Sequence, residues 1–316
     1  MLSPVSDPMS REERRAGVAL AAIFASRMLG LFLILPVFAV YARNLPGGLD
    51  PLLVGIAIGA YGATQALFQI PYGLASDRLG RKPVIVAGLL IFAAGSFLAA
   101  ASPDIHWIIA GRVVQGAGAV SAAVSALAAD LTREQHRTKV MAMIGSSIGL
   151  VFAFSLVAAP PLYALIGMPG IFVVTGVLAL LAIVLLLRVV PPAPPLPVVA
   201  PRSFSRILAD GRLARLNFGV LALHLMQTAL WVMVPPALVA AGLPVAQHWK
   251  IYLPAVLLSF AVMVPAIILA ERHDRMKGVF LVAILLLLLV ESGLATVATG
   301  VYGVGAFLLL FFVGFN

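Results

Sequence analysis

The sequence predicts an all-α membrane protein, and its composition and hydropathy carry that prediction. Of its 316 residues, 62% are apolar and 10% are charged, and the mean hydropathy is +1.09. Soluble globular domains carry about 25% charged residues. Apolar runs long enough to cross about 30 Å of hydrocarbon recur along the whole chain. This composition excludes the disordered and nucleic-acid-binding classes, and the absence of cysteine excludes disulfide frameworks and thiolate metal sites.

Nine apolar segments have the length of a membrane-spanning helix. Ser10, followed three residues later by Glu13, predicts a capping box at the start of the first segment. A tenth apolar run starts near Tyr302 and stops with the chain at Asn316, about 15 residues later, which is too short to cross at 1.5 Å per residue. We therefore expect nine complete helices and part of a tenth. The nine segments cover residues 16–42, 51–75, 83–102, 105–130, 139–166, 169–190, 216–241, 250–270 and 278–299.

Most of the 21 Lys and Arg residues fall on one side of these helices. The positive-inside rule assigns that side, and with it the N-terminus, to the cytoplasm. Only Arg43 and Lys250 fall on the other side, and Arg27 and Arg112 lie within spans. The net charge of +9 is therefore mainly a topological signal. The predicted cytoplasmic residues are Arg11, Arg14, Arg15, Arg78, Arg81, Lys82, Arg133, Arg137, Lys139, Arg188, Arg202, Arg206, Arg212, Arg215, Arg272, Arg275 and Lys277.

A proline-rich stretch after residue 190 divides the chain. Six prolines between Pro191 and Pro201 predict a semi-rigid, extended linker. We expect a six-helix bundle over 1–190, a cytoplasmic linker over 191–215, and part of a second bundle over 216–316. Phe204, Ile207 and Leu208 share one face and indicate either a short surface helix or a solvated turn. A related triplet, Asp77-Arg78-Leu79 and Asp274-Arg275-Met276, follows the second helix of each half, which is typical of a parallel repeat.

Two motifs resemble those of a known transporter family. The segment Gly73–Pro83, GLASDRLGRKP, closely resembles motif A of the major facilitator superfamily, in the loop between the second and third helices. Arg112–Gly118, RVVQGAG, is similar to motif B of drug/proton antiporters. The chain looks most like the YajR-type branch of these antiporters. The resemblance implies a fold of twelve helices, so the sequence looks truncated within the tenth.

Motif A is expected to act as a conformational switch. Gly73 and Gly80 are expected to allow a tight turn and close helix approach, and the ion pairs can form in one state and break in another. The resemblance implies that Asp77, Arg81 and Asp130 form a latch against the eleventh helix. The alternative is that these charges only set the topology. The predicted switch residues are Gly73, Asp77, Arg78, Gly80, Arg81, Lys82 and Asp130.

Arg27 and Arg112 are expected inside spans, where a charged side chain costs about 2.5–3.5 kcal/mol on insertion scales. Arg27 lies about ten residues into the first span, too deep to reach surface water easily. Because the cores of the first six spans contain no Asp or Glu, we expect Arg27 to serve a cavity for substrate or protons, and the alternative is a structural role. Arg112 either bonds to Gln115 and a neighbouring helix or, as motif B implies, contributes to proton coupling or ties the fourth span to the first.

The seventh span carries a stripe of polar and aromatic side chains at spacings of three and four residues, namely His224, Gln227, Thr228 and Trp231. The resemblance implies that the first, fourth, seventh and tenth helices line the central cavity. The stripe is therefore either half of a substrate site or an internally packed helix face. Glu291 is the one acid deep in a complete span and is either a proton carrier or part of the scaffold.

The resemblance implies a secondary transporter, not an enzyme. We expect a proton-coupled antiporter that exports small amphipathic molecules by alternating access, as in multidrug efflux. The fifth span only partly matches the antiporter motif, because Ala159 replaces the glycine before Pro160. The alternative is a symporter or uniporter that imports a small nutrient or sugar. A membrane-embedded enzyme or receptor would need a catalytic cluster or sensing domain, and the sequence offers neither.

The expected partners follow from the same interpretation. They are a small-molecule substrate, protons and the lipid bilayer, with no nucleic acid, cofactor or metal. No phosphate-binding glycine loop is present, so ATP is not expected to drive transport. We expect a monomer that crosses the bacterial cytoplasmic (inner) membrane several times.

Overall fold

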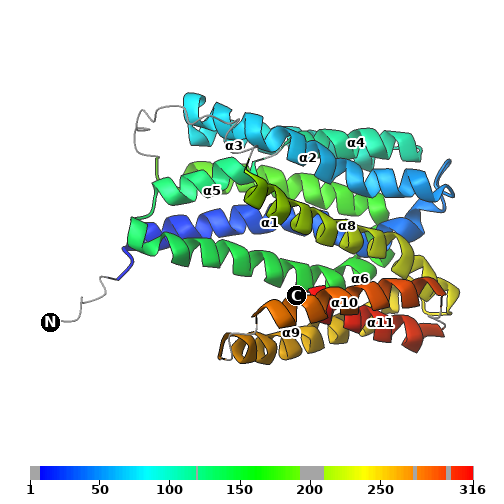
Figure 1. Ribbon diagram of the computed structural model, residues 1–316. Helices are drawn as coiled ribbons and strands as arrows, with labels where there is room; N and C mark the ends of the chain where they lie inside the picture. The colour runs from blue at the N-terminus through cyan, green and yellow to red at the C-terminus, as the bar shows by residue number, and fades with distance from the viewer. Residues whose placement is uncertain (1–7, 119, 193–209, 273–275, 297–299, 316) are drawn as a thin grey trace. The chain divides into compact units, whose positions relative to one another are not determined.

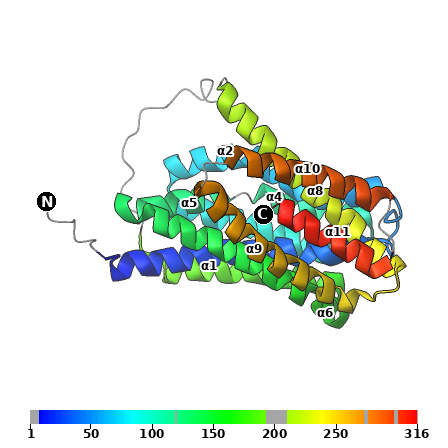
Figure 2. The same cartoon turned by 60° about the horizontal axis from the view of Figure 1, so that its bottom comes forward.

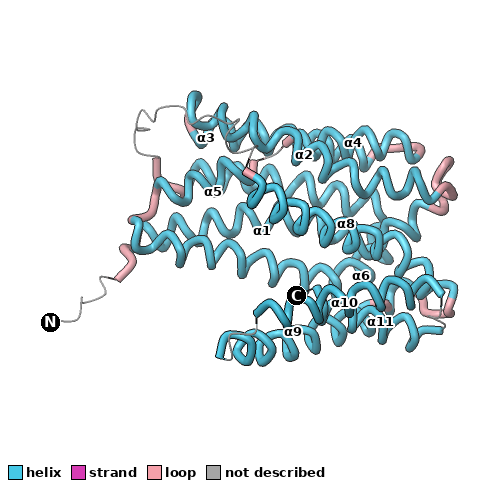
Figure 3. Tube along the Cα trace, viewed as in Figure 1, coloured by secondary structure: helices cyan, strands magenta, loops and turns pink. Residues whose placement is uncertain are grey.

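The computed structural model describes residues 8–118, 120–192, 210–272, 276–296 and 300–315. Every regular element within these residues is a helix (Figures 1 and 3), which confirms the all-α prediction. Seven helical stretches among them are long and apolar enough to cross a membrane. The expected linker helix at Phe204–Leu208 and the Asp274-Arg275 pair of the repeat lie outside the described residues.

The helices follow the order of the predicted spans. Their bounds are α1 Arg11–Ala42, α2 Pro51–Leu79, α3 Arg81–Ala100, α4 Ile105–Ala117, α5 Ser121–Asp130, α6 Glu134–Arg188, α8 Gly211–Ala240, α9 Trp249–Arg272, α10 Met276–Thr296 and α11 Gly300–Phe315, with a short 3-10 turn at Val245–Gln247.

Two regions differ from the pattern of one helix per span. Helix α6 contains both the fifth and the sixth predicted span, and its backbone leaves helical geometry at Gly167, between them, where φ is 65°. The span predicted over 105–130 is instead divided into α4 and α5. The division follows Gly118, whose backbone approaches α3 so closely that a Cβ there would lie 2.4 Å from the carbonyl oxygen of Gly88. A contact with another helix therefore interrupts a segment that hydropathy alone reads as continuous.

Side-chain caps fix several helix starts. The predicted capping box at α1 is confirmed: the Ser10 N–H donates to the Glu13 carboxylate at 2.8 Å, and the Glu13 N–H donates to the Ser10 hydroxyl at 3.1 Å. Asp50, Asp104 and Asp210 cap α2, α4 and α8 by accepting backbone N–H groups of the following turn. These caps satisfy amide groups that have no partner within their own helix.

The chain separates into two compact units, Met1–Ile34, Leu45–Phe152 and Met168–Pro201 in the first, and Leu35–Asn44, Ala153–Gly167 and Arg202–Asn316 in the second. The division into bundles at 1–190 and 216–316 stays a prediction. Helices α2, α3 and α4 pack side by side in the first unit (Figure 1). Gly95 and Gly111 allow α3 and α4 to approach closely, because a Cβ on Gly95 would lie 2.7 Å from the carbonyl oxygen of Gly111.

In the second unit, α11 packs against α8, α9 and α10, and Figure 2 shows α9, α10 and α11 side by side. The Trp231 ring is fully buried, with its centroid 5.5 Å from that of Tyr252 and 6.5 Å from that of Phe312. His248, just before α9, lies 3.1 Å from the Leu243 carbonyl oxygen through Nε2 and 3.2 Å from the Tyr252 hydroxyl through Nδ1. Burial lowers the pKa of His248. The imidazole therefore acts as a neutral brace between the loop and α9.

Candidate functional site

The turn between α2 and α3 depends on a single residue, Gly80. Its φ of 94° lies in a region that residues with a side chain rarely adopt, so the chain reverses here and α3 begins at Arg81. Pro83 falls in the first turn of α3, where its missing N–H leaves no helical hydrogen bond unmade. A Cβ on Gly73 would lie 3.9 Å from that of Ala122, an ordinary contact distance. The geometry thus requires glycine at position 80.

Arg81 gathers acceptors from two segments of the first unit. Its Nε donates to the Asp130 carboxylate at the end of α5, at 2.8 Å. Its Nη1 donates to the Ser76 hydroxyl at 2.8 Å and also to the Asp77 carboxylate. The Arg81 side chain is 10% exposed, whereas that of Asp77 is 58% exposed. The structure therefore brings together the three charged residues that the resemblance grouped.

The other two basic residues of motif A behave differently from each other. Arg78 is exposed at the end of α2. The Lys82 ammonium donates to the backbone carbonyl of Val190, just after the end of α6. Motif A is thereby connected to the last part of the first unit as well as to α5.

A second charged cluster on the first unit joins the start of α1 to the start of α6. Arg133, which caps α6, donates through its backbone N–H and its Nε to Glu13 Oε1, both at 3.0 Å, and through Nη2 to Oε2 at 2.9 Å. The Glu13 side chain is buried. Sequence reasoning assigned Glu13 to the capping box only. Its partner lies 120 residues away, and the one available signal was that both residues fall on the predicted cytoplasmic side.

The two charged clusters meet at a shared hollow of about 350 Å³. Of the residues that line it, Asp130 accepts a hydrogen bond from Arg81, and Arg133 donates to Glu13. The lining residues are Ser10, Glu13, Asp130, Leu131, Thr132 and Arg133. The start of α1, the end of α5 and the loop before α6 therefore line this hollow, and Asp130 connects it to Arg81 of motif A.

Arg112 is 1% exposed and has acceptors for all of its guanidinium nitrogens. Its Nη1 donates to the Gln115 side-chain oxygen at 2.9 Å, and Nε and Nη2 donate to the carbonyls of Ala57 and Ile58 at 3.3 and 3.4 Å. Gln115 in turn donates to the Ser96 hydroxyl at 2.7 Å. This network connects α4 to α2 and α3, whereas the resemblance suggested a connection to the first span.

Arg27 is 2% exposed and much less completely bonded. Its Nη1 donates to the Ser121 hydroxyl at 2.6 Å, whereas Nε and Nη2 are buried and have no acceptor among the described residues. The Arg27 guanidinium carbon lies 5.7 Å from the ring centroids of both Tyr61 and Phe92. The Arg112 guanidinium carbon lies 4.8 Å from that same Tyr61 ring. The two buried arginines therefore share one aromatic ring, which stabilises cations through its π face.

The candidates in the second unit are not gathered into one cluster. His224 is exposed on α8, with its Nδ1 2.9 Å from the Val220 carbonyl oxygen. Gln227 is partly buried on the same helix, and Trp231 packs in the aromatic core described above. Glu291 on α10 is partly buried, and its Oε1 has no hydrogen-bond partner among the described residues. The stripe on α8 thus divides into an exposed part and a packed part.

A family model described as Major Facilitator Superfamily matches residues 19–316. The chain belongs to the Major Facilitator Superfamily. It is therefore a membrane transporter of the secondary active kind and not an enzyme.

Two curated proteins and one solved structure are similar to this chain. The inner membrane transport protein YajR of Escherichia coli is 46% identical over 313 residues, which cover 98% of this chain and 69% of YajR. The quinolone resistance protein NorA of Staphylococcus aureus is 31% identical over 113 residues, 35% of this chain and 29% of NorA. A solved structure of a bacterial homologue of the human lysosomal transporter Spinster, inward-facing and occupied, has a TM-score of 0.73 at 15% identity. The structural match covers 96% of this chain and 73% of the Spinster homologue. At this sequence identity, the match shows the fold alone.

Within this superfamily transporter, the residues predicted from the sequence fall into two groups in the first unit. Asp77, Arg81 and Asp130 form an ion cluster at one end, and Arg112 and Gln115 form a buried brace. The participants that sequence reasoning missed are neutral or distant in sequence, namely Ser76, Ser96, Ser121, Phe92 and the Glu13–Arg133 pair. Hydroxyl and aromatic partners give no charge signal that would single them out in the sequence.

Proposed function

We propose that this transporter is a proton-coupled antiporter that exports small amphipathic molecules by alternating access. The observation that carries the proposal is the ion cluster of Asp77, Arg81 and Asp130. Charge pairs of this kind can break and re-form between two states, because the exposed pair with Asp77 contributes about 0.2–1 kcal/mol and the partly buried bond to Asp130 about 1.5–3 kcal/mol. The resemblance to drug/proton antiporters and the similarity to NorA, which is named for quinolone resistance, support export.

The proposal includes a topology and a division of the moving parts. We place the N-terminus in the cytoplasm, because most Lys and Arg residues fall on that side. The name of YajR supports an inner-membrane location. The bundles over 1–190 and 216–316, joined by the linker 191–215, are the proposed rocking halves of a monomer.

We assign different roles to the two buried arginines. Arg112 and Gln115 brace α4 against α2 and α3, because each guanidinium nitrogen already has an acceptor. Arg27 has two donors without acceptors among the described residues, so it is the better candidate to respond to a substrate or to a proton carrier. His224, Gln227 and Glu291 are the proposed contributions of the second half, and Trp231 holds α8 in place.

Substrate-driven proton movement tests the proposal. The full-length protein is reconstituted into liposomes that contain a pH-sensitive dye, and norfloxacin, a quinolone, is added on one side. Antiport predicts proton flux opposite to quinolone flux. Flux in the same direction would indicate a symporter, and quinolone transport without proton flux would indicate a uniporter. Either result would refute the proposal.

A matched pair of variants connects the assay to the ion cluster. Asp130→Asn removes one charge that Arg81 contacts, and Asp104→Asn makes the same chemical change at the partly exposed cap of α4. We expect the first variant to lower the rate of exchange by tenfold or more, on the order of one charge-assisted hydrogen bond, and the second to leave it unchanged. Equal rates of exchange in the two variants would show that the ion cluster is not required for transport.

A further inference from the structure

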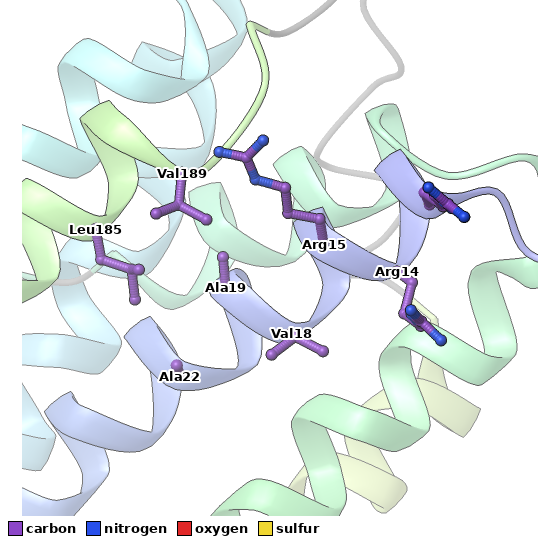
Figure 4. A pocket seen from close by; sticks show the side chains of 8 residues that line it. Arg14, Arg15, Val18, Ala19, Ala22, Leu185 and Val189 are labelled. Atoms are coloured by element: carbon purple, nitrogen blue, oxygen red, sulfur yellow. The ribbon is translucent and has the colours of Figure 1, made fainter.

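A second hollow, of about 350 Å³, lies between the start of α1 and the end of α6 on the first unit (Figure 4). It is distinct from the polar hollow beside motif A, since the two have no lining residue in common. The lining residues are Arg11, Arg14, Arg15, Val18, Ala19, Ala22, Leu185 and Val189.

The residues of α1 in this hollow form one continuous helix face. They recur at spacings of three and four, from Arg11 through Val18 to Ala22, which places them on one side of the helix. The first turns of this face are basic and the later turns are apolar. Leu185 on α6 and Val189, which follows the last residue of α6, supply the opposite wall. The lining therefore changes from cationic to hydrocarbon over about 16 Å of helix, at 1.5 Å per residue.

Within the part of the chain that the structure describes, no acidic side chain neutralises the three arginines at the basic end. Arg11, Arg14 and Arg15 are exposed, and none forms an ion pair within the described residues. Glu13, in the same turn of α1, is occupied by Arg133 and Ser10. Glu12 is the other acid of this turn, so the hollow keeps an excess of positive charge.

We propose that this hollow binds an anionic phospholipid, with its phosphate among the three arginines and an acyl chain along Val18, Ala22 and Leu185. The apolar span begins after Arg15, so the arginines lie at the depth of the lipid headgroups and Val18, 53% exposed, lies in hydrocarbon. Basic pockets between transmembrane helices bind anionic headgroups in this manner. A free phosphate ion would satisfy the arginines and leave the apolar half of the hollow unfilled.

The bound lipid has a direct structural connection to motif A. Val189 lines the hollow, and the carbonyl of the next residue, Val190, accepts a hydrogen bond from Lys82 of motif A. A lipid that bridges α1 and the end of α6 therefore fixes the segment to which motif A is attached. The lipid acts as a positioning ligand for this part of the first unit.

Lipid retention by the full-length protein tests the proposal. Purified protein is exchanged into mixed micelles of phosphatidylglycerol and phosphatidylcholine, and the bound lipid is counted by native mass spectrometry. Arg14→Gln with Arg15→Gln is compared with Arg212→Gln with Arg215→Gln, which removes the same charge from exposed residues of α8. At about fivefold per charge, we expect the α1 pair to lower phosphatidylglycerol retention by at least tenfold and the α8 pair to leave it unchanged.

Two further variants separate the lipid from a simple charge effect. Arg14→Lys with Arg15→Lys keeps the charge and the topological signal and should retain the lipid. Ala22→Trp fills the apolar half without changing a charge and should lower retention. Inorganic phosphate should not displace the lipid.

A readout on the wild-type chain does not depend on variants that could fail to fold. Phosphatidylglycerol with a photoreactive acyl chain should crosslink to the peptides that contain Val18 and Leu185. Equal retention by the α1 and α8 pairs, unchanged retention by Ala22→Trp, displacement by phosphate, or crosslinks confined to other helices would each overturn the proposal.

Discussion

The two carboxylates in the ion cluster of motif A are expected to contribute unequally to the stability of the protein. Asp130 accepts from Arg81 Nε at 2.8 Å with its side chain 24% exposed, whereas Asp77 is 58% exposed. A partly buried hydrogen bond between charged groups contributes about 1.5–3 kcal/mol, and an exposed ion pair about 0.2–1 kcal/mol. Asp130 also ends α5, where removing a negative charge returns about 0.3–1 kcal/mol through the helix dipole. We therefore expect Asp130→Asn to destabilise the protein by about 1–2.5 kcal/mol and Asp77→Asn by less than about 1 kcal/mol.

Thermal unfolding of the detergent-solubilised protein, followed by intrinsic fluorescence, measures this difference. Arg81→Gln alone and combined with each Asn substitution completes two double-mutant cycles, and the coupling energy with Asp130 should exceed that with Asp77. High salt should weaken only the Asp77 coupling, because screening acts mainly on exposed pairs. A larger effect at Asp77 than at Asp130, in stability or in coupling, would refute the assignment of Asp130 as the main partner of Arg81.

Three more predictions use the same thermal assay. Gly95→Ala places a Cβ 2.3 Å from the backbone nitrogen of Gln115 and should destabilise the protein by about 1–3 kcal/mol or more. Gly55→Ala meets no atom within 4 Å and should leave the stability unchanged or raise it. Similar melting points for the two variants would contradict the close packing of α3 against α4. Tyr61→Phe should change the stability by less than about 0.5 kcal/mol, because the Tyr61 hydroxyl has no hydrogen-bond partner among the described residues. Tyr61→Leu should lower the stability by about 2 kcal/mol, because it removes two cation–π contacts. Equal losses in the two variants would argue against these contacts. Burial lowers the pKa of His248, so the unfolded chain binds a proton at this residue more strongly than the folded protein does. The stability should therefore fall as the pH drops below about 6.5. A His248→Gln variant with the same pH dependence as the wild type would show that His248 does not cause it.

Features fixed by local chemistry could be predicted from the sequence. The capping box of Ser10 and Glu13 depends on two residues within one turn, and the turn at Gly80 on one residue type. Span positions follow from hydropathy alone, so the break in α6 at Gly167 falls between two predicted segments. The break after Gly118 could not be predicted in this way, because it depends on how closely α3 approaches.

Contacts between residues far apart in the sequence are the part of the candidate site that could not be predicted from the sequence. Glu13 and Arg133 are 120 residues apart, and Arg27 and Ser121 are 94 apart, so the sequence gives only the side or depth at which each lies. Helical spacing also cannot distinguish a cavity face from a packed face. Trp231 follows the same stripe as His224, yet it is fully buried among aromatic rings while His224 is exposed.

The two buried arginines differ in how many of their hydrogen-bond donors have acceptors, and Arg27 is the one with donors left unpaired among the described residues. Removing one guanidinium donor from water without an acceptor costs about 1–3 kcal/mol, so the two such donors on Arg27 oppose folding while Arg112 carries no comparable cost. Tyr61 and Phe92 offset part of that cost by covering the cation of Arg27, but a ring face accepts no hydrogen bond of full strength. Unsatisfied buried groups concentrate at functional sites, where an incoming ligand supplies the missing partner. An acceptor that reaches Arg27 therefore gains more than one that reaches Arg112, although both guanidinium groups contact the same Tyr61 ring.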